Sequence, residues 1–329
     1  METLELLAGI AALVALIVVP GAVLLAAFRK RGGLADLDLE LLEQLYVIVV
    51  LGFLLIGWLA LTLAELGLFS PLTLAACALL VTGIAGAAAR LGPGDLRRIL
   101  PWHRLSWVHP YLVAAAVMAI VITGEPFAWV IGGDDAGTYV DTGANISRTG
   151  AIEIYDDVTR EAAAAPPGTF FYNPNDREDP LYSRLPYRFQ FIGFFISDES
   201  TGEITGQGLH LLAAWVAVFH AFLGFPAGLY LFPLLALLAV CGVFQSVRRM
   251  FGTPTASLAV LFLAVNFLEV WFARYPTSEM LVQATLFAAL YLLAVADQAR
   301  SRLVAVLAAF AFSSMFFIRV DTGYIPVFI

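Results

Sequence analysis

Three carboxylates stand close together in the stretch GGDDAGTYVD, residues 132–141, directly after an apolar run. A carboxylate pair there can hold a metal ion, take a proton from an attacking hydroxyl group, or cap the first turn of a helix. If a helix starts here, Asp134 and Asp141 lie seven residues apart on one face, and Asn145 extends that face by a turn. Capping explains one aspartate well and three poorly, so Asp134, Asp135 and Asp141 are candidates for chemistry.

A second group of polar residues, 274–279, separates two later apolar runs. Its sequence RYPTSE fits a simple break between helices, in which a proline ends the first helix. Thr277 or Ser278 then caps the next helix, and Glu279 complements its first turn. That explanation leaves Arg274 without a role.

Further charged residues stand near the ends of the last apolar runs. Arg319 stands at the end of the final run and Asp321 directly after it, and Arg274 follows an earlier run. Each arginine can reach up to lipid headgroups, and two arginines facing an acidic loop can also clamp a phosphate group. Glu269 is costly to expose to lipid, so we expect its side chain to point into a cavity.

The composition is that of a membrane protein. Of 329 residues, 60% are hydrophobic and 13% are charged, whereas a soluble domain has about 25% charged residues. A transmembrane helix needs about 20 mainly apolar residues. Eight runs qualify: 5–28, 45–66, 71–89, 108–131, 227–247, 255–272, 278–297 and 303–320. We therefore expect an all-α polytopic membrane protein with about eight transmembrane helices.

The basic residues predict an orientation. The arginines and the lysine in the short connections all face the cytoplasm if the N-terminus lies outside. Residues 132–206 then lie outside, and they contain 13 of the 26 acids but 5 of the 18 bases. This acidic excess argues against nucleic acid as a partner. We expect a multi-pass protein of the cell (cytoplasmic) membrane with an extracytoplasmic acidic loop; the strong preference for arginine over lysine favours a prokaryote.

The apolar segment 209–223 decides whether this topology is self-consistent. If it crossed the bilayer, Arg248 and Arg249 would move to the outside. Its 15 residues, at about 1.5 Å each, fall short of a ~30 Å hydrocarbon core. Because it contains two histidines and Trp215, we expect a helix lying in the outer interface, which closes an external loop of residues 132–226.

The external loop has the pattern of a small mixed α/β unit. A helix is expected from Asp134 or Asp135 to the residue before Gly150, which serves as its C-cap. Short β-like runs follow at 151–155, 169–172 and 187–196, and residues 198–202 have the composition of a turn.

The order of these features resembles the GT-C superfamily of membrane glycosyltransferases, which use polyprenyl-phosphate sugars and include protein O-mannosyltransferases and lipid A aminoarabinose transferases. Asp134-Asp135-Ala136 with Tyr139 matches the acidic pair of the first external loop. His210-Leu211 with Phe222-Leu223-Gly224 is similar to the juxtamembrane helix. Segment 248–252 resembles the basic end of the family's second core span. Segment 274–279 resembles a segment near the next external turn. The resemblance covers about residues 108–320.

The resemblance implies a division of the chain. Residues 1–107 form three N-terminal helices with their cytoplasmic connections, and residues 108–329 form a GT-C-like core that ends before the family's C-terminal module. The three leading helices depart from the typical member, and so does Asp135, where a glutamate is commoner.

The resemblance also implies an activity: transfer of a sugar from a polyprenyl-phosphate donor to an acceptor hydroxyl on a glycan, lipid or protein, at the outer face of the membrane. Asp134 would act as general base, with Asp135 as its orienting or metal-binding partner. A divalent cation, Mg²⁺ or Mn²⁺, could bind to this pair. The residues expected around the substrate are Asp141, Tyr139, His210, Arg274, Glu279, Arg319 and Asp321.

Two other functions stay open. The chain could be a non-catalytic membrane protein, such as a transporter or an envelope assembly factor whose acidic loop recruits a partner or cation. It could also be a degenerate GT-C homologue without a complete donor site. Transporters usually carry charges near the bilayer midplane, whereas here the charges stand at helix ends, which disfavours transport.

Overall fold

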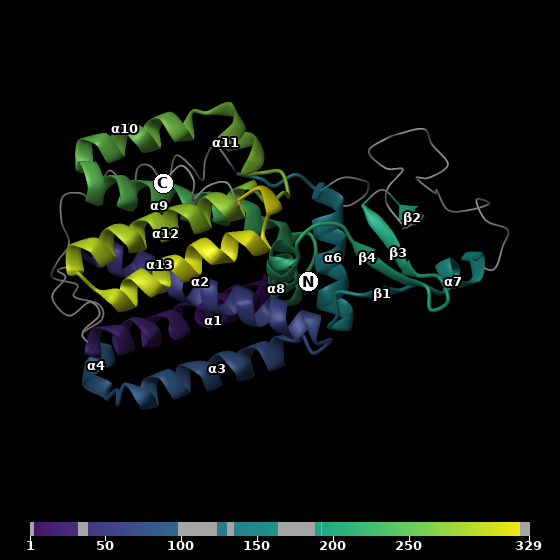
Figure 1. The fold of residues 1–329 in the computed structure, drawn as a ribbon, viewed down its shortest axis with the longest axis horizontal. Coiled ribbons are helices and arrows are strands. Elements are labelled where there is room, and N and C mark those ends of the chain that lie inside the picture. Colours follow the sequence, from purple (N-terminus) through teal and green to yellow (C-terminus); the bar gives the residue numbers. More distant parts are fainter. Residues whose placement is uncertain are drawn as a thin grey trace.

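The computed structural model shows a bundle of long apolar helices with a small α/β unit at one end (Figure 1). It describes residues 3–31, 39–97, 124–129, 135–163, 188–191 and 193–322.

Five of the described helices are long and apolar enough to cross a membrane. They are α1 (Thr3–Lys30), α2 (Leu41–Glu65), α3 (Pro71–Ala88), α9 (Leu231–Phe251, preceded by the 3₁₀ turn η3, Ala227–Tyr230) and α12 (Glu279–Ala299). Each coincides with one of the expected spans. The structure therefore supports a helical membrane protein, but the expected number of eight spans is too high for the part of the chain that it describes.

Two of the missing spans are interrupted or short. The run 255–272 divides into α10 (Thr253–Ala264) and α11 (Phe267–Phe272), because Asn266 lies between them and its side chain caps α11 by accepting from the Leu268 amide at 2.9 Å. The run 303–320 gives α13 (Arg302–Ser314) and the turn η4 (Met315–Phe317).

The third, 108–131, lies largely outside the described residues. Its described part, 124–129, is irregular and not helical, so the expected helix does not extend that far.

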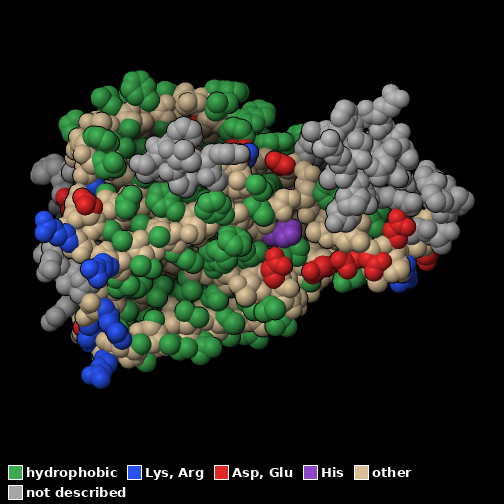
Figure 2. Space-filling model, viewed as in Figure 1, with side chains coloured by type: hydrophobic (Ala, Val, Ile, Leu, Met, Phe, Trp, Pro, Cys, Tyr) green, Lys and Arg blue, Asp and Glu red, His purple; other side chains and the backbone are tan. Residues whose placement is uncertain are grey.

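The basic ends of several helices meet at one end of the bundle. Lys30, at the end of α1, pairs with Asp95 of α4 (Pro93–Arg97) at 2.7 Å. At the end of α9, Arg249 donates to both carboxylate oxygens of Glu43 in α2, at 2.6 and 2.8 Å. These contacts place the end of α9 beside the start of α2. Figure 2 shows most of the basic side chains on this face at this end, with some acidic ones among them, and most of the acidic side chains at the other.

The α/β unit occupies the opposite end of the bundle (Figure 1). It contains α6 (Asp135–Thr149), α7 (Asp157–Ala163) and an antiparallel sheet in the order β1-β4-β3-β2. The strands are β1 (Ile154–Tyr155), β2 (Arg188–Phe191), β3 (Phe194–Asp198) and β4 (Glu203–Gly206). The expected helix from Asp135 to Gly150 is confirmed, as is the turn at 198–202. The β-like run 169–172 lies outside the described residues.

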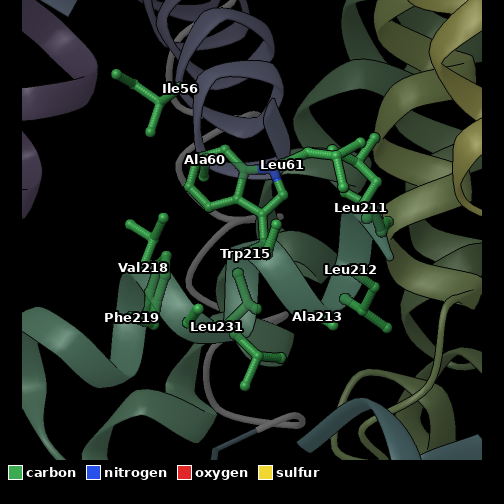
Figure 3. Close-up of a cluster of buried hydrophobic side chains, with 14 of the residues drawn as sticks. Ile56, Ala60, Leu61, Leu211, Leu212, Ala213, Trp215, Val218, Phe219 and Leu231 are labelled. Carbon is green, nitrogen blue, oxygen red and sulfur yellow. The ribbon is translucent and has the colours of Figure 1, made fainter. Parts of the chain in front are cut away.

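Helix α8 (Leu211–Leu223) joins the two parts and is almost entirely buried. Its 13 residues are indeed too few to span a bilayer, but 11 of them are buried. Figure 3 shows Trp215 between its own helix and the α2 residues Ile56, Ala60 and Leu61, and its ring stacks on Phe53 at 4.0 Å. We expected this helix to lie in the outer interface; α1, α2 and α6 cover it within the protein, and its level in the membrane stays a prediction.

Candidate functional site

The N-terminus of α6 presents Asp135 at the junction between bundle and sheet. Its carboxylate accepts a hydrogen bond from the Gln207 side chain at 3.2 Å. Gln207 follows β4, and its backbone N–H donates to the Gly193 carbonyl at 2.7 Å, so the sheet fixes the position of Gln207. The start of a helix electrostatically favours an acidic side chain such as that of Asp135. Asp134 lies outside the described residues.

Tyr139 stands one turn after Asp135 and is 7% exposed. Burial raises the pKa of Tyr139, and the charge of Asp135 raises it further, whereas a hydrogen bond with Ser278 and the charge of Arg319 act in the opposite direction. The hydroxyl is therefore neutral at ordinary pH and can donate a hydrogen bond. Through Tyr139, α6 contacts the first residues of α12.

Arg319, just after η4, organises the carboxylates on the other side. It donates to Glu279 at 2.6 Å and to both oxygens of Asp321 at 2.9 and 3.0 Å. It also reaches the Ser278 hydroxyl at 3.4 Å. Two carboxylates thus already balance the positive charge of one guanidinium.

The structure thus brings together residues from three distant parts of the chain. Asp135 and Tyr139 come from α6, Glu279 from the start of α12, and Arg319 and Asp321 from the segment after α13. We call these five residues, with Ser278 and Gln207, the outer cluster. It contains three carboxylates and one arginine. Glu279 Oε2 is buried with no hydrogen-bond partner among the described residues.

Three of the expected site residues lie outside the outer cluster: Asp141, His210 and Arg274. Asp141 is half-buried, and its position two residues after Tyr139 turns it about 200° around α6, away from Tyr139. Burial raises the pKa of Asp141 to about 6. The His210 ring lies 3.7 Å from Glu65, at the end of α2, and 3.4 Å from the Gly206 carbonyl.

Arg274 holds the segment 124–129 against the start of the loop between α11 and α12. Its Nε donates to the Glu125 carbonyl at 2.7 Å, and its guanidinium lies 4.5 Å from the centre of the Phe127 ring. Neither contact neutralises the charge of Arg274, in contrast to Arg319.

Sequence reasoning missed two residues of the outer cluster. Ser278 was expected to cap α12, but its side chain makes no capping bond and contacts Arg319 and Tyr139 instead. Gln207 had no expected role. The signal for Gln207 was its position as a single polar side chain between Gly206 and Gly208, where the backbone turns sharply.

The described residues do not by themselves form a metal site. No group of three or more His, Cys, Asp or Glu side chains within the described ranges is arranged to hold an ion. A site made by Asp134 and Asp135 stays a prediction, since only Asp135 is described.

Comparisons with protein-family models, with curated proteins and with solved structures give no match to this chain.

Proposed function

We propose that the chain transfers a sugar from a polyprenyl-phosphate donor to an acceptor hydroxyl at the outer surface of the membrane. One observation carries the proposal. The outer cluster joins the acidic start of α6 to Glu279 and Arg319 at the end of an apolar bundle, and the basic helix ends lie at its opposite end. By the positive-inside rule the basic end faces the cytoplasm, so the cluster faces outward.

This location suits a lipid-linked donor. The polyprenyl tail stays in the bilayer while its phosphate lies at the interface, level with residues that end or begin membrane helices. Arg274 is the better partner for that phosphate, because its present contacts are a carbonyl group and an aromatic ring. Arg319 instead positions Glu279, whose second oxygen can accept a hydrogen bond from a sugar hydroxyl.

The proposed reaction is a displacement at the anomeric carbon. The bond between that carbon and the phosphate oxygen breaks, and the polyprenyl phosphate leaves with the electron pair. The acceptor oxygen forms the new bond, and its proton passes to a carboxylate. We assign that carboxylate to Asp134, with Asp135, which accepts a hydrogen bond from Gln207, as its partner. A divalent cation bound to the two aspartates would stabilise the leaving phosphate.

One observation favours a second candidate, a non-catalytic recognition protein. The charge of Arg319 is already balanced by Glu279 and Asp321, which is the arrangement expected if these residues only fix the position of the loop. In that case the acidic surface of the α/β unit would bind a cationic partner, and no sugar would be transferred.

The two candidates differ in a transfer assay. The full chain in nanodiscs is mixed with radiolabelled polyprenyl-phosphate hexose or pentose and acceptor lipids, and release of polyprenyl phosphate is followed. We expect turnover by the native chain, loss of about 10²-fold or more in Asp134→Asn, and weaker donor saturation in Arg274→Ala. Arg302→Ala, at the basic end, is the matched control. Turnover that Asp134→Asn leaves unchanged would remove the base assignment.

A further inference from the structure

An apolar groove between α1, α2 and α9 is separate from the outer cluster. It has a volume of about 410 Å³. It follows α2 from Leu42 to Phe53 and α9 from Leu231 to Gln245. At about 1.5 Å per residue these stretches are ~17 and ~21 Å long, somewhat more than half of a ~30 Å bilayer core. The groove is therefore long enough to hold the acyl chain of a lipid from one leaflet.

Polar side chains mark one end of this groove. Gln245 is completely buried, and both atoms of its side-chain amide have no hydrogen-bond partner among the described residues. The Tyr46 hydroxyl is likewise buried and without a partner in this part of the chain. Tyr46 faces α9 one turn before Gln245, since a side chain at Gly242 would press on its hydroxyl. Unpaired buried donors are costly, so the Gln245 Nε2 and the Tyr46 hydroxyl at one end of this groove indicate a bound group that supplies an acceptor.

The position of these groups identifies the chemistry of that partner. Gln245 lies three residues before Arg248, so it is ~4.5 Å further from the basic end of the bundle. With the Arg248 side chain taken to lie among the headgroups, this places Gln245 at the level of the ester groups, which join the headgroup of a glycerophospholipid to its acyl chains. An ester carbonyl accepts the hydrogen bonds that the Gln245 amide and the Tyr46 hydroxyl can donate. The headgroup phosphate then lies at the basic end, near Lys30, which also pairs with Asp95, and Arg248, which also pairs with Glu40.

We propose that this groove is a binding site for one glycerophospholipid of the leaflet at the basic end, with an ester carbonyl at Gln245 and Tyr46 and an acyl chain along α2 and α9. A second groove, between α1 and α3, provides an internal comparison. Its volume is about 530 Å³, but every side chain that lines it is apolar. Because this second groove offers no polar partner to an ester group, we expect it to contact lipid without binding one lipid specifically.

The test uses a phosphatidylglycerol with a diazirine in one acyl chain, added to the full chain in detergent and irradiated. We expect saturable labelling of α2 and α9 at about one lipid per chain, competed by unlabelled phosphatidylglycerol. Leu238→Trp fills the groove and should lower labelling about tenfold or more. Leu79→Trp, in the second groove, should leave it unchanged.

A second variant separates lipid binding from folding. Gln245→Leu removes a buried unpaired amide, so the thermal midpoint of the lipid-free chain should stay the same or rise, while affinity for the probe falls about tenfold. Labelling spread evenly around the bundle, or equal in both grooves, would overturn the proposal. So would non-saturable labelling of the native chain, a result that does not depend on whether any variant folds.

Discussion

Asp135 and Asp141 belong to the same helix but have different surroundings. Asp135 accepts a hydrogen bond from Gln207 and lies beside Tyr139, whereas Asp141 is half-buried on another side of α6. Burial raises the pKa of Asp141 to about 6, so its charge is a cost to the folded state at neutral pH. At the scale of residues, the two aspartates differ in their surroundings, and only Asp135 belongs to the outer cluster.

The pKa of Asp141 predicts a pH-dependent stability. Because the folded-state pKa of about 6 lies above the ~3.9 of the unfolded chain, the folded state binds more protons between these values, and raising the pH destabilises it. After allowance for solvent screening, we expect a loss of about 1 kcal/mol or less in the native chain. Asp141→Asn should therefore raise the thermal midpoint at pH 7.5 and leave it unchanged at pH 4.

The exposed Asp157→Asn serves as the control for this series. Equal midpoints of the native chain and Asp141→Asn at both pH values would show that Asp141 is better solvated than the structure indicates.

At the scale of elements, the contact between α6 and α8 connects the outer cluster to the bundle. Gly143 lies against α8 so closely that a methyl group there would overlap the Val216 side chain. Any displacement of α6 also moves Asp135 and Tyr139, since both belong to that helix. The geometry of the site therefore depends on the packing of a buried helix that carries no catalytic group.

This contact predicts a paired result for two glycine substitutions. Gly143→Ala should destabilise the protein by about 1–3 kcal/mol and reduce sugar transfer, because it separates α6 from α8. Gly83→Ala, on a face of α3 with open space around it, should be neutral or slightly stabilising. Thermal unfolding in detergent measures both, and a Gly143→Ala variant as stable as Gly83→Ala would contradict the close packing.

The elements were predictable where the apolar pattern is long and unbroken. Helices α1, α2, α3, α9 and α12 coincide with expected spans for this reason. The burial of α8 was missed although its sequence contained the signal, since a helix that is apolar on every side is usually covered by protein. The break at Asn266 was missed because one capping residue interrupts an otherwise apolar run.

At the scale of the whole molecule, the two ends of the bundle differ in charge. The basic ends of α1 and α9 meet the acids of α4 and α2, and the outer cluster lies at the other end. The positive-inside rule suggested which helix ends lie together. The meeting of Arg319 with Glu279 could not be predicted, because 40 residues separate them and their pairing depends on how α12 and α13 pack.

The proposed orientation predicts the accessibility of two introduced cysteines. Both native cysteines are first replaced by alanine. The Val158 side chain lies on α7 and is 72% exposed, so Val158→Cys should react with an impermeant thiol reagent applied from outside. Met250→Cys, at the basic end and 56% exposed, should react only after the membrane is opened. Labelling of both positions in intact cells would contradict the orientation.

The most direct test of the outer cluster compares two conservative substitutions of acidic residues in the sugar-transfer assay. Asp135→Asn removes a carboxylate that the structure places beside Tyr139 and Gln207, whereas Glu161→Gln changes an exposed acid on α7. We expect Asp135→Asn to lower the transfer rate about tenfold or more and Glu161→Gln to leave it unchanged. Equal rates for the two variants and the native chain would contradict the claim that the outer cluster is the site of transfer.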